Sequence, residues 1–437
     1  MQEYQNEAQR RRKARLAKKA RMQRRRRSVA LIAAAVALVV LVLLFGRGAQ
    51  QPEDPVETTL PPQTTAPQQT TPQQTNPQQP DEAAPQTGTT VIHVAVAGDL
   101  NVTDYVLENA AHENGYDFSE SFLDVAPILS GADLALLNFE GNLSGGSYGS
   151  TTGAAPLELP KALKAIGVDA VQTANSAAIR QGVSGLVTTL DAFEHVGLTS
   201  LGTYADAADF RRSGGYEIVE VNGIRIALIA FTKGMDNLGL PAGSENCVNV
   251  LYEDYATTYQ NVAEDKINSI LRNVRAAEPD YIIALLHWGS EYNDEHSATQ
   301  EEIRELLFAG GVDAIVGTHS HRVQAVEFDR DAGTFTAYSL GDFYSDTVEA
   351  GTNYSVVLNL QITRDNATGE TKLTDYTCTP IYNMTPDESR ETALRLVRTE
   401  TAMEGFEIGI YNSISQELYD NMAYTLERIE YRLGISE

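Results

Sequence analysis

Short apolar runs recur between residues 91 and 340, and segments with helical periodicity lie between several of them. The runs cover 91–97, 132–139, 168–174, 224–230, 281–286, 312–317 and 335–340. The helical patterns cover 157–166, 185–195, 259–277 and 298–309. Strands that alternate with helices predict an α/β fold, built on a mainly parallel sheet whose two faces are both covered.

Polar side chains follow these runs where each strand is expected to end. Ligands of such sheets bind beyond the carboxyl ends of the strands. Carboxylate, amide and imidazole groups are ligands for divalent metals, and this mixed set suits Zn, Mn or Fe. A single histidine or a Gly-Asp turn is normally structural, so the interpretation depends on six residues sharing one topological position. They are Asp99, Glu140, Asn175, His287, His319 and His321.

The N-terminus differs in charge from the rest of the chain. The 437 residues carry a formal net charge of −26, but residues 1–47 alone carry +11 and the remainder −37. This acidic remainder argues against nucleic acid as a partner. Residues 29–45 are apolar throughout, and as a helix they would span about 26 Å. They predict one transmembrane helix, with residues 1–28 as a basic cytoplasmic tail and the bulk of the chain outside the cell membrane.

Two alternatives to this topology stay open. A cleaved signal peptide is the main one, although the residues after Phe45 make a poor cleavage site. Nucleic-acid binding by the basic run is disfavoured, because such a cluster beside a spanning helix is normally a topology signal. Residues 46–90 hold nine of the sixteen prolines and repeat a Pro-Gln-Gln pattern. They predict an extended spacer, and recognition of the repeat by a partner is the alternative.

Five segments in this order resemble the motifs of the CapA family, the poly-gamma-glutamate capsule synthesis family of the calcineurin-like metallophosphoesterase superfamily. They are Gly98-Asp99, Asn138-Phe-Glu140, Leu286-His-Trp-Gly-Ser-Glu-Tyr292, Gly317-Thr-His-Ser-His321 and Tyr338-Ser-Leu-Gly-Asp-Phe343. The resemblance covers residues 91–345. It implies a four-layer αββα sandwich and an extracytoplasmic, membrane-tethered role in making, exporting or anchoring an anionic cell-surface polymer such as poly-gamma-glutamate.

The resemblance also implies roles for individual residues. A divalent metal would be held by Asp99, Asn175, His287, His319 and His321. Glu140 and Glu291 would act as catalytic acid or base groups, or as partners that orient the imidazoles. Independently of the resemblance, Arg180 and Arg322 flank this site and could supply the basic pocket that an anionic substrate needs on so acidic a domain, and Asp342 is also expected to bind substrate. Polymer, or a polymer synthase complex, is the expected partner.

One stretch departs from the family pattern. Ser176 stands where an amide ligand is expected, Ala177 where a histidine assists the leaving group, and Arg180 where an aspartate is expected. These changes agree with a site of weakened catalytic activity, with a site rebuilt for different chemistry, and with a site that has lost its activity. We expect a retained pocket with reduced or altered activity. Two alternatives stay open: an active metal-dependent hydrolase, and a non-catalytic binding domain on the same fold.

The remaining segment, 346–437, is expected to pack on the same domain. Residues 354–362 and 372–379 read as a hairpin, and 388–404 and 414–433 as helices. The only two cysteines, Cys247 and Cys378, lie outside the membrane in this topology. Whether they form a disulfide is left open by the sequence.

Overall fold

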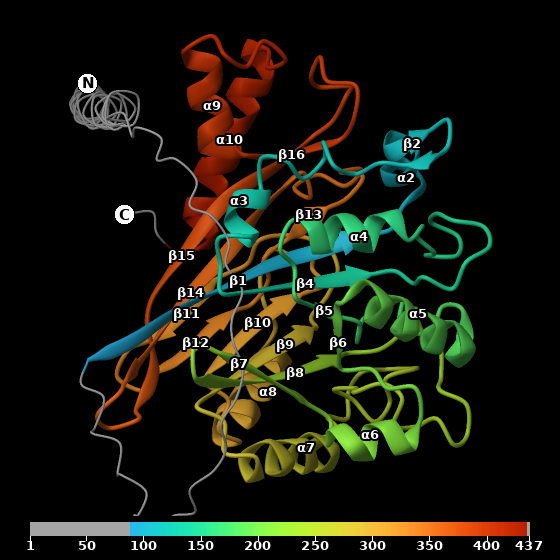
Figure 1. Cartoon of the computed structure of the whole chain (residues 1–437), viewed down its shortest axis with the longest axis vertical. Coiled ribbons are helices and arrows are strands. Elements are labelled where there is room, and N and C mark those ends of the chain that lie inside the picture. The colour runs from blue at the N-terminus through green and yellow to red at the C-terminus, as the bar shows by residue number, and fades with distance from the viewer. Residues whose placement is uncertain (1–87, 435–437) are drawn as a thin grey trace, which may run out of the picture. The chain divides into compact units, whose positions relative to one another are not determined.

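The computed structural model describes residues 88–434 (Figure 1). The expected cytoplasmic tail, the transmembrane helix at 29–45 and nearly all of the spacer lie outside these described residues. Within residues 88–434, no helix has both the length and the apolar character that crossing a bilayer requires.

The larger of two main sheets has the strand order β16-β15-β14-β1-β4-β5-β6, with β13 also paired to β1. Strands β1, β4, β5, β6 and β13 run parallel, whereas β14, β15 and β16 extend the sheet with antiparallel pairing. The bounds are β1 Thr89–Asn101, β4 Leu134–Glu140, β5 Ala170–Gln172, β6 Thr199–Leu201, β13 Asp342–Tyr344, β14 Tyr354–Asp365, β15 Thr371–Met384 and β16 Arg395–Arg398.

The second sheet has the order β11-β12-β10-β9-β8-β7, with antiparallel pairing only at its two edges. The bounds are β7 Glu217–Val221, β8 Ile224–Thr232, β9 Tyr281–His287, β10 Ala314–Thr318, β11 Val326–Asp329 and β12 Thr334–Ala337. A separate small hairpin joins β2 (Ala111–His112) to β3 (Gly115–Tyr116). The apolar runs of the sequence therefore fall on strands of both sheets.

Strand β8 shows why the two sheets stack. Its alternate side chains Ile226 and Leu228 enter the core between the sheets, whereas Ile229 and Phe231 enter a second core on the outer face. A strand with two apolar faces must be covered on both sides. Helices cover the outer face of the second sheet, with bounds α7 Glu264–Ala276 and α8 Ala298–Ala309. Helix α6 (Ala207–Ser213) contributes Phe210 at the edge of the same core.

A third core covers the outer face of the larger sheet. Its helices are α2 Asp104–Ala110, α3 Ala126–Leu129, α4 Glu158–Ala165 and α5 Gly182–Val196. Figure 1 shows α4 and α5 on the opposite side of the two sheets from α7 and α8. The expected α/β fold is thus confirmed for residues 88–434, as two stacked sheets with helices outside each.

The C-terminal segment contains one more strand than expected. Helices α9 (Thr399–Glu407) and α10 (Gln416–Arg432) pack against β15 (Figure 1). However, residues 395–398 are strand β16, so the helix expected over 388–404 is wrong in its first half. The reason is the strand alternation of this segment, because Leu396 enters the outer core and Val397 the core between the sheets. Cys247 and Cys378 are both free thiols, so the structure contains no disulfide between them.

Candidate metal centre

Four strand ends bring carboxylates and imidazoles from both sheets to one place. Asp99 lies on β1, Glu140 ends β4, His287 ends β9, and His319 and His321 follow β10. The Nδ1 atom of His287 lies 3.9 Å from Oδ1 of Asp99, and its Nε2 lies 3.6 Å from Oε1 of Glu140. The Nδ1 atom of His321 lies 3.9 Å from Oδ2 of Asp99. Residues up to 222 positions apart therefore surround one point at the carboxyl edge of the sheets.

These side chains form three overlapping groups, in each of which the candidate ligand atoms lie within 4.8 Å of one another. The groups are Glu140-His287-His319, Asp99-Glu140-His321 and Glu291-His319-His321. Both glutamates thus lie at ligand distance from histidines, in addition to the ligands expected from the sequence. Glu291 is exposed at the rim of the group, whereas the Glu140 side chain is only 10% exposed.

Three buried atoms of this cluster lack hydrogen-bond partners among residues 88–434. They are Oε2 of Glu140, Nε2 of His287 and Nδ1 of His319. A buried polar atom without a partner costs about 1–3 kcal/mol, so such atoms are rare in folded proteins. Oε2 of an ionised Glu140 has free lone pairs, and each of these two imidazole nitrogens has one in the neutral tautomer that carries its hydrogen on the other ring nitrogen. The donor set therefore fits a divalent cation.

Burial sets the protonation of these groups. It raises the pKa of Glu140 to about 7 and that of Asp99 to about 6, because a carboxylate is poorly solvated in the interior. Burial also lowers the pKa of His287 and of His319 well below the ordinary value. Both imidazoles are therefore neutral, which is the form that ligates metals.

His321 behaves differently because it contacts Asp342. Burial alone would lower its pKa, but Asp342, Glu140 and Asp99 raise the pKa of His321 well above the ordinary value. Its Nδ1 donates a hydrogen bond of 2.8 Å to Oδ1 of Asp342, which also accepts one from the amide of Asn101 at 2.9 Å. The structure therefore places Asp342, expected to bind substrate, where it orients an imidazole.

The loop after β10 has a backbone conformation that residues other than glycine rarely adopt. His319 has φ 90° and His321 has φ 59°, both in the left-handed region. The backbone N–H of His319 donates a 2.9 Å hydrogen bond to Oδ2 of Asp99. Such conformations cost energy and persist where surrounding contacts impose them. Here the contact with Asp99 fixes the loop that carries two imidazoles of the cluster.

Asn175 contacts its neighbours with both ends of its amide. Its Nδ2 donates to Oδ1 of Asn138 at 2.9 Å and to the carbonyl of Phe139 at 2.7 Å, and its Oδ1 accepts from the N–H of Ala177 at 3.1 Å. Asn138 in turn donates to Oδ1 of Asp99 at 2.5 Å. Asn175, expected as a metal ligand, thus belongs to an amide chain that positions Asp99.

Two positioning residues were missed from the sequence. Asn138 precedes Glu140 by two residues on β4, so strand alternation places both side chains on the same face of the sheet. That spacing was the available signal. Ser176 donates its hydroxyl hydrogen bond to Oε1 of Glu140. The position that lacks the expected amide therefore fixes a carboxylate, and Ala177 beside it is fully buried.

The two arginines expected to bind substrate are paired with carboxylates. A guanidinium nitrogen of Arg180 lies 2.6 Å from Oδ2 of Asp236, and one of Arg322 lies 2.9 Å from Oδ1 of Asp294. Asp294 also accepts contacts from two arginines of α10, Arg428 at 3.3 Å and Arg432 at 2.6 Å. We call these four residues the Asp294 cluster. It ties the C-terminal helix to the loop that follows His321.

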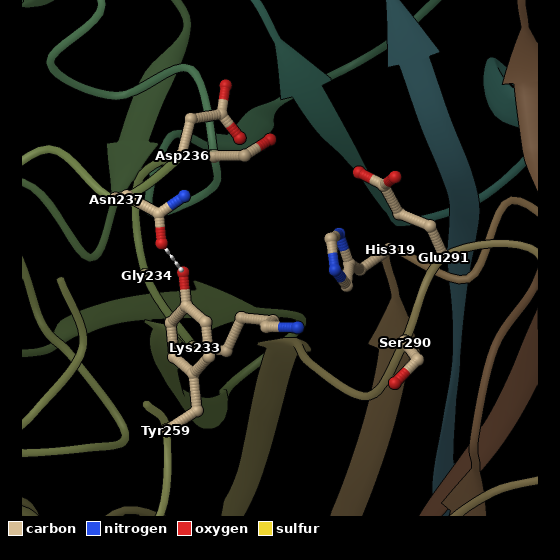
Figure 2. Close-up of a pocket in the computed structure, with 9 residues that line it drawn as sticks. Lys233, Gly234, Asp236, Asn237, Tyr259, Ser290, Glu291 and His319 are labelled. Carbon is tan, nitrogen blue, oxygen red and sulfur yellow. Dashed lines mark hydrogen bonds between the residues drawn. The ribbon is translucent and has the colours of Figure 1, made fainter. Parts of the chain in front are cut away.

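A cavity of about 210 Å³ opens beside the histidines (Figure 2). Its lining residues come from several loops: Ser176, Lys233, Gly234, Asp236, Asn237, Tyr259, Ser290, Glu291 and His319. In Figure 2 the side chains of Lys233 and His319 reach into it from opposite sides. Lys233 was not singled out from the sequence; it directly follows strand β8, which extends two residues beyond the predicted run 224–230. The cavity therefore meets the cluster at Glu291 and His319.

Residues 93–347 match the model of the family described as bacterial capsule synthesis protein PGA_cap. The chain belongs to this family. It is 26% identical over 313 residues to the PGA biosynthesis protein CapA of Bacillus subtilis (strain 168), covering 70% of this chain and 76% of that protein. It is 25% identical over 282 residues to the capsule biosynthesis protein CapA of Bacillus anthracis, covering 63% of this chain and 64% of that protein. The CapA resemblance is therefore confirmed.

Solved structures give a weaker comparison. A calcineurin-like phosphoesterase from Bacillus subtilis, YfkN, aligns with a TM-score of 0.41 and 15% identity, covering 79% of this chain and 99% of that one. A phosphatase from Mycoplasma pneumoniae aligns with a TM-score of 0.41 and 15% identity, covering 68% and 95%. At these values the likeness carries no functional argument, so the assignment of this CapA-family chain depends on its sequence relatives.

Proposed function

We propose that this chain is a membrane-anchored, extracytoplasmic CapA-family protein that acts in the synthesis, export or anchoring of an anionic cell-surface polymer such as poly-gamma-glutamate. We further propose that it uses a divalent-metal pocket of reduced or altered activity. Family membership supports the polymer role. The basic segment, apolar run and proline-rich spacer of residues 1–90 support the anchored topology.

The three unpartnered buried atoms of Glu140, His287 and His319 carry the metal proposal. They lie on members of the overlapping ligand groups, and no contact within residues 88–434 satisfies them. Zn, Mn or Fe suits this mixture of oxygen and nitrogen donors. When bound, such an ion would polarise an oxyanion of the substrate and stabilise the negative charge that develops on it.

The chain's own residues hold the cluster ready for this chemistry. Asn138 fixes the Asp99 carboxylate, Ser176 fixes Glu140, and Asp342 fixes the ring of His321. Ala177 has no proton to give to a leaving group. Loss of a positioned proton donor typically lowers a rate about 10²- to 10⁴-fold. This supports a pocket that binds and polarises, with slower or different turnover.

Metal analysis of the full chain in detergent tests the pocket. We expect a stoichiometric ion in the parent, and its loss in the His287→Ala/His319→Ala double variant, which removes two nitrogen donors. The exposed His195 of α5 offers a matched control, and His195→Ala should retain the ion. A parent without bound metal would contradict the metal proposal.

Surface polymer and topology test the cellular role. A deletion strain should lose or release its anionic surface polymer, and the parent gene should restore it. External protease on intact cells should cleave the C-terminal part of the chain. Unchanged polymer in the deletion strain would refute the polymer role, and full protease protection would refute the proposed orientation.

An active metal-dependent hydrolase is a second candidate. The observation that favours it is the overlap of three ligand groups in one place, with His287 and His319 held neutral by burial. Turnover of a phosphoester or polymer substrate by the metal-loaded parent, abolished in the double-histidine variant, would favour this candidate. Binding without turnover would favour a non-catalytic domain.

A further inference from the structure

Lys233 stands at the carboxyl edge of the sheets, beside the metal-ligand cluster. It follows Thr232, the last residue of β8, and Thr232 is in register with His287 on the parallel strand β9. The backbone N–H of Lys233 donates a 2.8 Å hydrogen bond to the carbonyl of His287. The side chain of Lys233 therefore starts from the same level of the sheet as an imidazole of the cluster.

The ammonium group of Lys233 is anchored but not neutralised. Its Nζ donates a 2.7 Å hydrogen bond to the carbonyl of Gly289 and lies 4.7 Å from the ring centroid of Tyr259. No carboxylate lies within salt-bridge distance of it among residues 88–434. By contrast, Arg180 and Arg322 are each paired with an aspartate. An ammonium has three N–H donors, so hydrogen-bonding capacity is left for another partner, while the Glu291 carboxylate acts on the charge of Lys233 from beyond salt-bridge distance.

The cavity determines where that partner would lie. Lys233 and His319 point into it from opposite sides, and Glu291 lies at its margin (Figure 2). Desolvation by burial lowers the pKa of Lys233, and the Glu291 carboxylate partly opposes this shift. The charge of Lys233 also lowers the pKa of both His287 and His319, so it acts electrostatically on the ligand groups. An anion in this cavity would satisfy the ammonium and face the candidate ligands at the same time.

We propose that the Lys233 ammonium binds an oxyanion of the substrate, a carboxylate or a phosphate group, and holds it against the metal-ligating histidines. The proposal deepens the function proposed above and rests on it for the identity of the substrate. A lysine acts as a compact point charge and does not require the planar, two-pronged geometry of arginine. Carboxylate and phosphate therefore share the recognition chemistry, and the experiment separates them.

The test is calorimetric titration of the full chain in detergent with two probes, inorganic phosphate and tri-γ-glutamate, each with and without Mn²⁺. Lys233→Met removes the charge but keeps a long apolar side chain beside Tyr259. We expect it to weaken binding about 10- to 100-fold, since a charged hydrogen bond is lost, without changing the metal stoichiometry. Lys233→Arg should keep binding within about threefold. Lys161→Met makes the same charge change on an exposed face of α4 and should have no effect.

The outcomes separate this proposal from the proposed function. Tighter binding of phosphate assigns a phosphate substrate, and tighter binding of tri-γ-glutamate assigns a carboxylate substrate. If the parent holds no metal but Lys233→Met still abolishes binding of a probe, the metal proposal fails and the Lys233 site stands. If neither probe binds the parent, or Lys233→Met and Lys233→Gln bind as the parent does, the Lys233 site is refuted. Thermal unfolding of each variant confirms that it is folded.

Discussion

Replacing Glu140 by glutamine should affect the metal-free and metal-loaded protein in opposite ways. Glu140 is an ionisable group in a site that holds it away from water, with its Oε2 unpartnered. Glutamine has the same shape and keeps an oxygen that can accept the hydrogen bond from Ser176. It removes the buried charge and also removes a strong metal ligand.

The size of the first effect follows from the pKa of Glu140. Burial raises it from 4.5 to about 7, so the folded protein holds this proton more tightly than the unfolded chain does. Ionisation therefore lowers the free energy of unfolding progressively as the pH rises from 4.5 to about 7. This difference in pKa between the folded and unfolded states corresponds to about 3 kcal/mol of unfolding free energy. Glu140→Gln should thus stabilise the metal-free protein by about 3 kcal/mol at pH 8 and by almost nothing at pH 4.

Urea denaturation of the full chain in detergent, after chelation, measures this effect. Trp288 is the only tryptophan and is fully buried against Tyr338, so its fluorescence reports unfolding. Asp313→Asn is the matched control, since burial raises the pKa of that carboxyl to about 6 and its Oδ2 accepts from the N–H of Ile282, at the amino end of β10 away from the cluster.

Saturating Mn²⁺ then separates the two variants. A ligand at 100 times its dissociation constant adds about 2.7 kcal/mol of stability. The parent and Asp313→Asn should both gain this stabilisation, whereas Glu140→Gln should gain little. Lower stability of chelated Glu140→Gln than of the parent at pH 8 would refute the electrostatic reasoning. An undiminished Mn²⁺ response of that variant would remove Glu140 from the ligand set.

Three further predictions concern the surroundings of the cluster. Gly98→Ala should destabilise the fold by about 3 kcal/mol in urea denaturation, because the added Cβ would lie 1.8 Å from the carbonyl oxygen of Gly341; unchanged stability would refute that close approach. Asp294→Asn should lower the free energy of unfolding by about 2 kcal/mol and increase hydrogen exchange in α10, because three arginines, including the buried Arg432, lose their carboxylate. An unchanged free energy of unfolding would show that the Asp294 cluster does not stabilise the fold. Mn²⁺ affinity should rise steeply between pH 5.5 and pH 8 by calorimetry, because the raised pKa of Glu140 makes metal compete with a proton; a flat profile would contradict this.

Most strands could be predicted because a buried strand has a local run of apolar residues. Strand β9 is apolar at nearly every position, and the structure buries all of Tyr281–His287. Strand β16 could not be predicted in the same way, since Arg395-Leu-Val-Arg398 is too short to set a period against the helix that follows. Its state is decided by pairing with β15 and by two cores that lie on opposite sides of it.

The convergence of the candidate site was also accessible from the sequence, because the carboxyl ends of parallel strands share one edge. The hydrogen-bond partners of individual side chains could not be predicted from the sequence. Asn175 was expected as a ligand because amide oxygens bind metals, but the sequence did not show that its Nδ2 donates to Asn138 and Phe139 or that its Oδ1 accepts from Ala177. Asp342 was expected to bind substrate, but the sequence did not show that its Oδ1 accepts a hydrogen bond from His321. Pairwise geometry of this kind arises from packing between distant segments, which a local pattern does not contain.

The arginine and lysine side chains also show that partners depend on packing between distant segments. Arg180 and Arg322 looked like anion-binding groups because they are charged and adjacent to site motifs, but a charge attracts a ligand only if nothing in the protein has already compensated it. Asp236 pairs with Arg180, and Asp294 pairs with Arg322 while also pairing with two arginines of α10. Lys233 follows a strand whose predicted end carried no metal-ligand type, and no carboxylate in the described residues forms a salt bridge with it. Its place in the cavity makes it the stronger anion-binding candidate, because what remains unpaired after folding, rather than what is charged in the sequence, is available to a substrate.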